Sequence, residues 1–133
     1  MTKTTSYEIS KKLKEAGFDK GSAFAHFKSK CGGGGIFYVW EGIKGGYEKE
    51  FFSYDLETLL DALPKKLANK YGKNGALKLS YDTKLNWIYY ADKEDYILFF
   101  NDYAFCEIKS QENESLADTA GKMWLMLKEK GMV

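Results

Sequence analysis

Four β-rich segments in the second half of the chain constrain its fold more than any other feature of the sequence. They span residues 77–81, 85–91, 96–100 and 104–108, and only short polar breaks separate them. Breaks this short join neighbouring strands that run in opposite directions, whereas parallel strands need connections of about a dozen residues or more. The last break, Asn101-Asp102, suits a two-residue hairpin turn because Asn and Asp tolerate positive φ. The sequence therefore predicts an antiparallel meander.

A second β region precedes the meander. Residues 22–30 alternate in hydropathy and predict a strand, Ile36–Glu41 predict its hairpin partner, and Glu50–Ser53 predict a third short strand. Gly32–Gly35 lie between the first two strands and predict an irregular connection. These glycines lead into a strand, so they lack the helix N-terminus that a phosphate-binding loop requires.

Two segments at the ends of the chain have the 3.6-residue periodicity of amphipathic helices. The first spans residues 7–16, follows a capping box formed by Thr5 and Glu8, and ends before Gly17. The other spans residues 116–130 and begins and ends with equally clear capping residues. Both segments are therefore expected to form helices that bury one apolar face.

A third helical segment lies in the middle of the chain. Residues 56–63 follow Asp55, a good N-cap, and repeat leucine at helical spacing. Pro64 cannot continue this helix, and it suits the first position of a further short helix that carries Leu67 and Tyr71 and stops at Gly72. The sequence therefore predicts two short helices with a bend between them.

The order of these elements predicts an α+β fold, an antiparallel sheet (meander plus hairpin) with three or four helices packed mainly on one face. The chain has 133 residues, which suits a single domain over residues 1–133. Trp124 lies in the apolar stripe of the last helix and is expected to anchor the core.

Composition argues against several classes of function. All 20 basic residues are Lys and the net charge is +1, so the bidentate Arg contacts and the positive charge of a nucleic-acid reader are missing. No apolar run is long enough for a membrane span, and the first residues lack a signal-peptide core. Two Cys cannot form a disulfide framework, so we expect a reduced, cytoplasmic protein without a membrane partner.

Few residues suggest chemistry. His26 and Cys31 are expected on opposite faces of their strand, and one His with two Cys is too few for a zinc site, so we predict no catalytic residues, no metal and no cofactor. The acidic turn Asp92–Asp95 is interpreted as a solvated turn. As an alternative, this turn and the neighbouring tyrosines form a small-ligand site or an unrecognised active site.

Aromatic residues are the strongest positive signal. The chain has ten Tyr, nine Phe and three Trp, and aromatic residues occupy both faces of the predicted strands. One interpretation is a second apolar layer over the sheet. The other is an exposed surface that contains Trp40, Trp87 and Tyr89 and binds either a partner protein or a second copy of the chain. A homodimer is expected on the second interpretation.

Three stretches, KKLKEAGF, YDLETLLDALPKKL and SLADTAGKMWLMLKEKG, together resemble the helices of small uncharacterised proteins encoded by phages, prophages and mobile elements. The resemblance covers about a third of the chain and implies an origin of this kind and an α+β fold. It carries no assigned activity. The sequence thus predicts a non-enzymatic, cytoplasmic protein-interaction or accessory protein of phage or prophage type.

Overall fold

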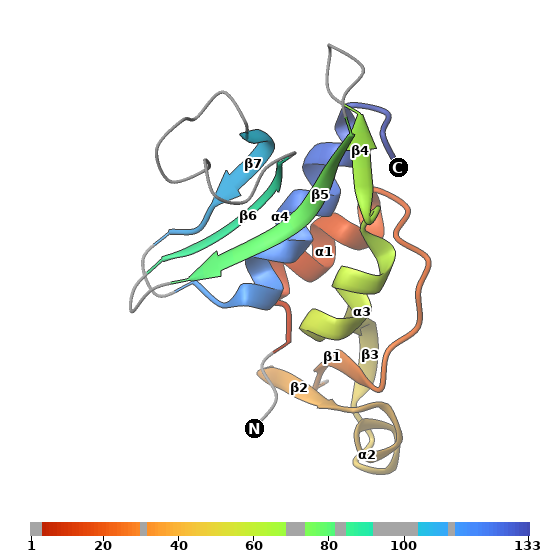
Figure 1. Cartoon of the computed structure of the whole chain (residues 1–133). Helices are drawn as coiled ribbons and strands as arrows, with labels where there is room; N and C mark the ends of the chain where they lie inside the picture. Colours follow the sequence, from red (N-terminus) through yellow and green to blue (C-terminus); the bar gives the residue numbers. More distant parts are fainter. Residues whose placement is uncertain (1–3, 30–31, 69–73, 82–84, 92–103, 112–113) are drawn as a thin grey trace.

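The computed structural model describes residues 4–29, 32–68, 74–81, 85–91, 104–111 and 114–133 (Figure 1). The elements, in chain order, are α1 (Tyr7–Glu15), β1 (Phe24–Lys28), β2 (Gly34–Tyr38), α2 (Val39–Lys44), β3 (Glu48–Ser53), α3 (Leu56–Ala62), β4 (Lys66–Ala68), β5 (Asn74–Tyr81), β6 (Asn86–Ala91), β7 (Ala104–Lys109) and α4 (Leu116–Glu129).

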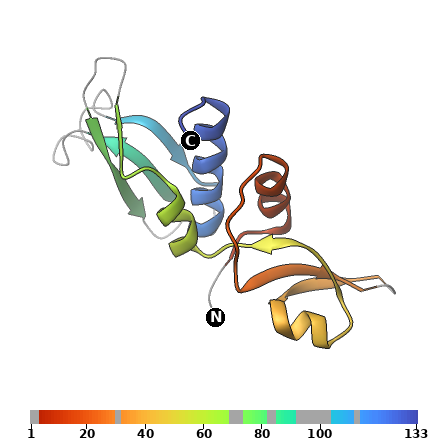
Figure 2. The ribbon, with the colours of Figure 1, turned by 90° about the vertical axis from the view of Figure 1, so that its right-hand side faces the viewer.

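The α+β class is confirmed, and the strands form two antiparallel sheets. One has the order β2-β1-β3 and contains the predicted hairpin, while the other has the order β4-β5-β6-β7 and contains the meander strands. Figure 2 shows the sheets at opposite ends of the molecule, with α1 and α4 between them. The hairpin and the meander therefore do not share one sheet.

Helix α1 confirms the first predicted helix, but its N-cap is Ser6 and not Thr5. The Ser6 side chain accepts the N–H of Ile9. The Thr5 hydroxyl is buried and instead accepts the N–H of Tyr54 at 3.0 Å, a tertiary contact that sequence spacing does not indicate. At the C-terminus Gly17 has a φ of +89°, which closes the helix as a Schellman motif.

The predictions for residues 32–41 were partly wrong. Gly34 and Gly35 belong to strand β2, and the chain leaves the strand at Tyr38 to form helix α2. A side chain at position 34 would overlap the backbone carbonyl of Phe27, so glycine is what permits the close pairing of β1 with β2. The glycines therefore continue the strand, while the β-prone Val39 and Trp40 begin a helix.

Helix α3 and its Asp55 cap are confirmed, since Asp55 Oδ1 accepts the N–H of Thr58 at 2.8 Å. The second short helix after Pro64 was wrong, because Lys66–Ala68 form strand β4 and pair with β5. Tyr71 and Gly72 lie outside the described residues. Pairing with β5 gives this segment backbone partners that the local sequence cannot reveal.

Strands β5, β6 and β7 confirm three of the four meander strands, and β6 pairs directly with β7. The expected strand at 96–100, the turn at 101–102 and the acidic turn Asp92–Asp95 lie outside the described residues, as does Cys31.

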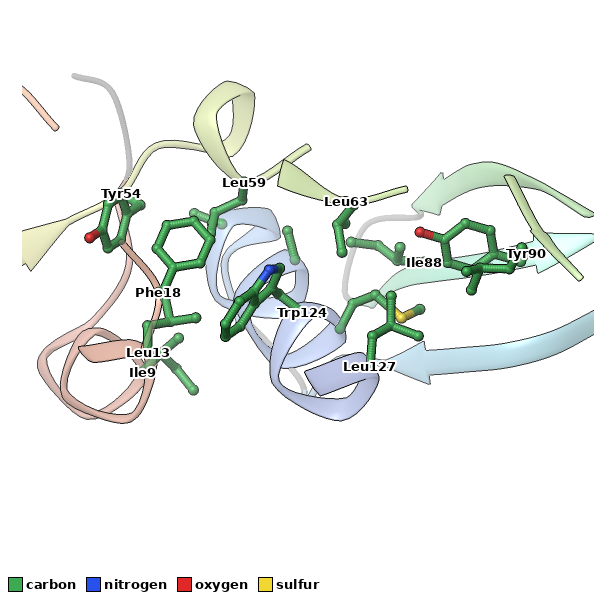
Figure 3. Packing of buried hydrophobic residues seen from close by; sticks show 14 residues of the cluster. Ile9, Leu13, Phe18, Tyr54, Leu59, Leu63, Ile88, Tyr90, Trp124 and Leu127 are labelled. Atoms are coloured by element: carbon green, nitrogen blue, oxygen red, sulfur yellow. The ribbon is translucent and has the colours of Figure 1, made fainter. Parts of the chain in front are cut away.

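Helix α4 packs against β6 and β7 on one side and against α1 and α3 on the others, so it lies at the centre of the molecule. Its cap at Ser115 and its closure at Gly131 are as predicted. Trp124 is 8% exposed, and its ring lies 4.9 Å from that of Phe18 in an edge-to-face contact. Figure 3 shows Trp124 beside Phe18 and Leu127 on the side of Tyr90, so α4 joins the two ends of the core.

Candidate functional site

Strand β2 forms an edge of the three-stranded sheet. Two hydrogen bonds bracket its pairing with β1: the Val39 N–H donates to the Ala23 carbonyl at 2.9 Å, and the Ser29 N–H donates to the Gly33 carbonyl at 3.0 Å. Bonded positions alternate along an antiparallel pair, so the odd-numbered residues of β2 face β1. The N–H and C=O groups of Gly34, Ile36 and Tyr38 therefore point outward along the edge.

The other described edges carry features that discourage pairing. Strand β3 begins with Glu48, Lys49 and Glu50, β4 has three residues, and β7 includes Glu107. Charged side chains and short length are the usual protections of an edge strand. Strand β2 (GGIFY) has no charge and no proline, so it is the least protected edge in the described part of the chain.

Large apolar side chains surround this edge. The exposed fractions are 44% for Ile36, 45% for Tyr38, 58% for Trp40 and 65% for Ile43. The rings of Tyr38 and Trp40 are stacked with centroids 6.3 Å apart, and the Lys44 ammonium lies 5.3 Å from the Trp40 ring. We call these four side chains and the outward backbone groups of β2 the β2–α2 surface. Clustered apolar exposure of this kind is typical of interaction sites.

Helix α2 holds Trp40 and Ile43 beside the strand, and glycines fix its position. Gly42 is buried directly against the ring of Phe27, where a side chain would overlap that ring. Gly46 has a φ of +76°, and the Tyr47 N–H donates to the Gly42 carbonyl at 3.1 Å, which closes the helix. Trp40 and Ile43 are therefore exposed on a helix whose packing and closure depend on glycines.

A depression of about 460 Å³ lies beside the β2 edge, on the face of the sheet that α1 covers. It is lined by Tyr7, His26, Phe27, Lys28, the glycines 33–35, Ile36 and Glu50. Gly34 lies opposite Lys28 in the register, and its backbone is exposed at the rim of the depression. The glycine that the strand pairing requires is therefore also part of the wall of this depression.

The structure does not bring the three predicted partner-binding residues together. Trp40 is exposed on α2, whereas Trp87 and Tyr89 lie on β6 in the other sheet, with ring centroids 4.3 Å apart. Trp87 is half-buried, and its Nε1 donates to Glu107 Oε2 at 3.0 Å. Tyr89 is only 6% exposed, since β6 is a central strand with a neighbour on each side. Of the three, Trp40 alone contributes to the β2–α2 surface.

A buried polar cluster joins α1 to the three-stranded sheet. His26 Nε2 lies 3.0 Å from Ser10 Oγ and 3.1 Å from the Thr5 carbonyl oxygen, and the Ser53 hydroxyl donates to that carbonyl at 2.7 Å. Burial lowers the pKa of His26 below its usual value. Ser10 is fully buried, so its hydroxyl is not accessible to a substrate although it is within reach of a base. This cluster serves to fasten α1 to the sheet.

A second depression, of about 410 Å³, lies between the N-termini of α1 and α4. Its carboxylates have partners: Asp118 Oδ1 accepts the Ser6 N–H at 2.7 Å, and Glu114 is paired with Lys122. Across the described ranges, no three His, Cys, Asp or Glu side chains are grouped so that they could hold a metal ion. Nor does any helix in those ranges have the length and apolar character needed to cross a membrane.

Comparisons with known proteins add no relative. No protein-family model matches the chain, and no curated protein or solved structure matches it.

Sequence reasoning missed Ile43 and the outward edge of β2. The signal that could have found Ile43 is its spacing of three residues from Trp40, which places both on one face of a helix, together with the helix-closing Gly45-Gly46 pair. No comparable signal indicates that β2 lies at an edge, because edge position depends on which strands pair.

Proposed function

We propose that this chain is a non-enzymatic, cytoplasmic accessory protein, of the phage or prophage type that its helices resemble, and that it binds another polypeptide through the β2–α2 surface. The observation that carries the proposal is the coincidence of an uncharged sheet edge with four large exposed apolar side chains. The polypeptide is expected to add as a strand to β2.

The chemistry of the surface favours a polypeptide over a small ligand. Alternate residues Gly34, Ile36 and Tyr38 direct backbone donors and acceptors outward in a row, which is the pattern that an added strand satisfies. Trp and Tyr are the residue types that contribute most to interface energy, and Tyr38 and Trp40 supply both beside the edge. The outward N–H and C=O groups of β2 would provide the affinity for the added strand, and the exposed apolar side chains would provide selectivity.

A peptide-display selection tests the proposal. The protein is immobilised below 1 µM and panned with a library of twelve-residue peptides, and the affinities of the selected peptides are measured by fluorescence anisotropy. Ile36→Lys and Trp40→Ala should each weaken binding at least tenfold. Leu85→Lys is the matched control, because Leu85 is 43% exposed and lies before β6, in the other sheet. It should leave binding unchanged.

Two outcomes would count against the proposal. One is a set of selected peptides that bind all variants equally. The other is a clear rise in thermal stability with a metabolite or a divalent ion, because a ligand at a hundred times its Kd stabilises a protein by about 2.7 kcal/mol. That result would favour the small-ligand alternative.

A further inference from the structure

We infer that the polypeptide that β2 binds is a second copy of this chain. Two β2 strands pair in antiparallel orientation about a two-fold axis through Ile36, and Tyr38 of each copy covers Gly34 of the other. The inference rests on the proposed function and names the partner for the same surface. Three features of β2 support it: the positions of its outward backbone groups, the placement of its glycines and aromatics, and its lack of charge.

The outward backbone groups of β2 set the register of the pair. With the axis at Ile36, Gly34 of one copy lies opposite Tyr38 of the other, and the two Ile36 residues face each other. All three residues have outward N–H and C=O groups, so each opposed pair exchanges two backbone hydrogen bonds. Shifting the two-fold register by one step in either direction pairs Tyr38 with Gly32, or Gly34 with Trp40, and neither of these partners lies in β2. The register centred on Ile36 is therefore the one that uses the whole strand.

Gly34 and Tyr38 are opposed on one face of the pair in this register. Directly opposed residues in an antiparallel pair project from the same face, with Cβ atoms about 5 Å apart. In this register the Tyr38 ring of one copy lies over Gly34 of the other, at the depression of about 460 Å³ that Gly34 and Ile36 line. An aromatic ring that covers a glycine in a sheet shields backbone that would otherwise be exposed.

Within strand β2 an aromatic ring already lies against a glycine. On the opposite face of β2, the ring of Phe37 lies 3.4 Å from the position that a Cβ of Gly35 would occupy. The backbone of Gly34 is exposed, and Tyr38, whose ring lies 4.6 Å from that of Phe24, is 45% exposed. A two-fold axis brings this exposed backbone and this exposed ring together twice.

Charge does not oppose this pairing. The central contact places Ile36 against Ile36, and no charged side chain lies in β2. The pairing joins two three-stranded sheets into one continuous six-stranded sheet, with strand order β3-β1-β2 followed by the same strands in reverse. The edge that is least protected in the monomer becomes the centre of the dimer.

Sedimentation velocity from 1 to 200 µM tests the inference. The monomer mass is 15.2 kDa, so the wild-type chain should sediment as a species of about twice that mass at the upper concentrations. Ile36→Lys and Ile36→Glu each place like charges opposite one another, and each should raise the dissociation constant at least tenfold. Leu85→Lys, with nearly the same exposed fraction as Ile36, should still dimerise. Far-UV circular dichroism establishes that the variants are folded.

An equimolar mixture of I36K and I36E gives the sharpest result. If the two-fold axis passes through position 36, Lys faces Glu in the mixed dimer, and association should return. A wild-type chain that stays monomeric at 200 µM would overturn the inference, and peptide binding would then still decide the proposed function independently. Failure of the mixture to associate, although the wild type dimerises, would overturn this register. Loss of the dimer in Leu85→Lys would show that the effect is not specific to β2.

Discussion

Gly121 lies in the middle of α4, on the side that packs against α1. A Cβ added at Gly121 would lie 2.7 Å from Ile9 Cγ2 and 3.5 Å from Leu13 Cδ1. Both of these side chains belong to α1, and they are 5% and 0% exposed. Substituting Gly121→Ala therefore sets two effects against each other, a gain in helix propensity and a steric overlap between two buried helices.

The structure indicates that the cost of the steric overlap with Ile9 exceeds the gain in helix propensity. Alanine in a helix interior is about 1 kcal/mol more favourable than glycine. Extra volume in a well-packed core typically costs about 1–3 kcal/mol. The overlapping methyl of Ile9 is on a β-branched side chain with one strongly preferred χ1 in a helix, so it cannot rotate away cheaply. We expect Gly121→Ala to lower the free energy of unfolding by up to about 2 kcal/mol.

Urea denaturation followed by tryptophan fluorescence measures this change, and a double-mutant cycle with Ile9→Ala isolates its cause. Ile9→Ala alone should cost about 2–5 kcal/mol. In that background the methyl is gone, so Gly121→Ala should instead stabilise the protein by up to about 1 kcal/mol. The reasoning would be refuted if Gly121→Ala stabilised the wild type, or if its effect were the same in both backgrounds.

Two further predictions concern buried groups. Trp124→Ala should lower the free energy of unfolding by about 3–5 kcal/mol, because it removes the ring that packs on Phe18. Trp40→Ala should lower it by less than about 1 kcal/mol, because Trp40 is exposed. Chemical denaturation measures both losses, and equal losses would contradict this account of the core. Burial lowers the pKa of His26, so the unfolded chain binds a proton more readily, and stability should fall as the pH drops below about 6.5. Unfolding measured at pH 7.5 and 5.5 should show this loss in the wild type and a smaller one in His26→Gln; equal losses in both would contradict it.

The helix ends of this protein could be predicted because they depend on neighbouring residues. Asp55 and Ser115 accept N–H groups three residues further along, and Gly17 and Gly131 adopt the positive φ that closes a helix. Thr5 is the exception: Ser6 caps α1, because the Thr5 hydroxyl binds Tyr54, which is distant in the sequence.

The predictions that failed involve strand pairing. Leu67 has helical spacing but lies in β4, because β5 offers it a backbone partner. Gly34 and Gly35 have low strand propensity but pair with β1, and at Gly34 only glycine permits the close approach to Phe27. Strand propensity is weak and context decides it, so local sequence could not indicate either outcome.

The sequence indicates that aromatic residues form the candidate surface, but it does not indicate which of them are exposed. Composition alone gives a surplus of aromatic residues, and the sequence cannot show that Trp40 is 58% exposed while Tyr89 is 6% exposed. That difference arises because Tyr89 lies on a central strand and Trp40 on a short helix beside an edge strand. The sequence was sufficient for the fold class, for helices α1, α3 and α4 and for most of their caps, since these depend on local periodicity and hydrogen bonding. The edge of the sheet and the exposed aromatics were decided only by tertiary structure, because both depend on which distant strands pair.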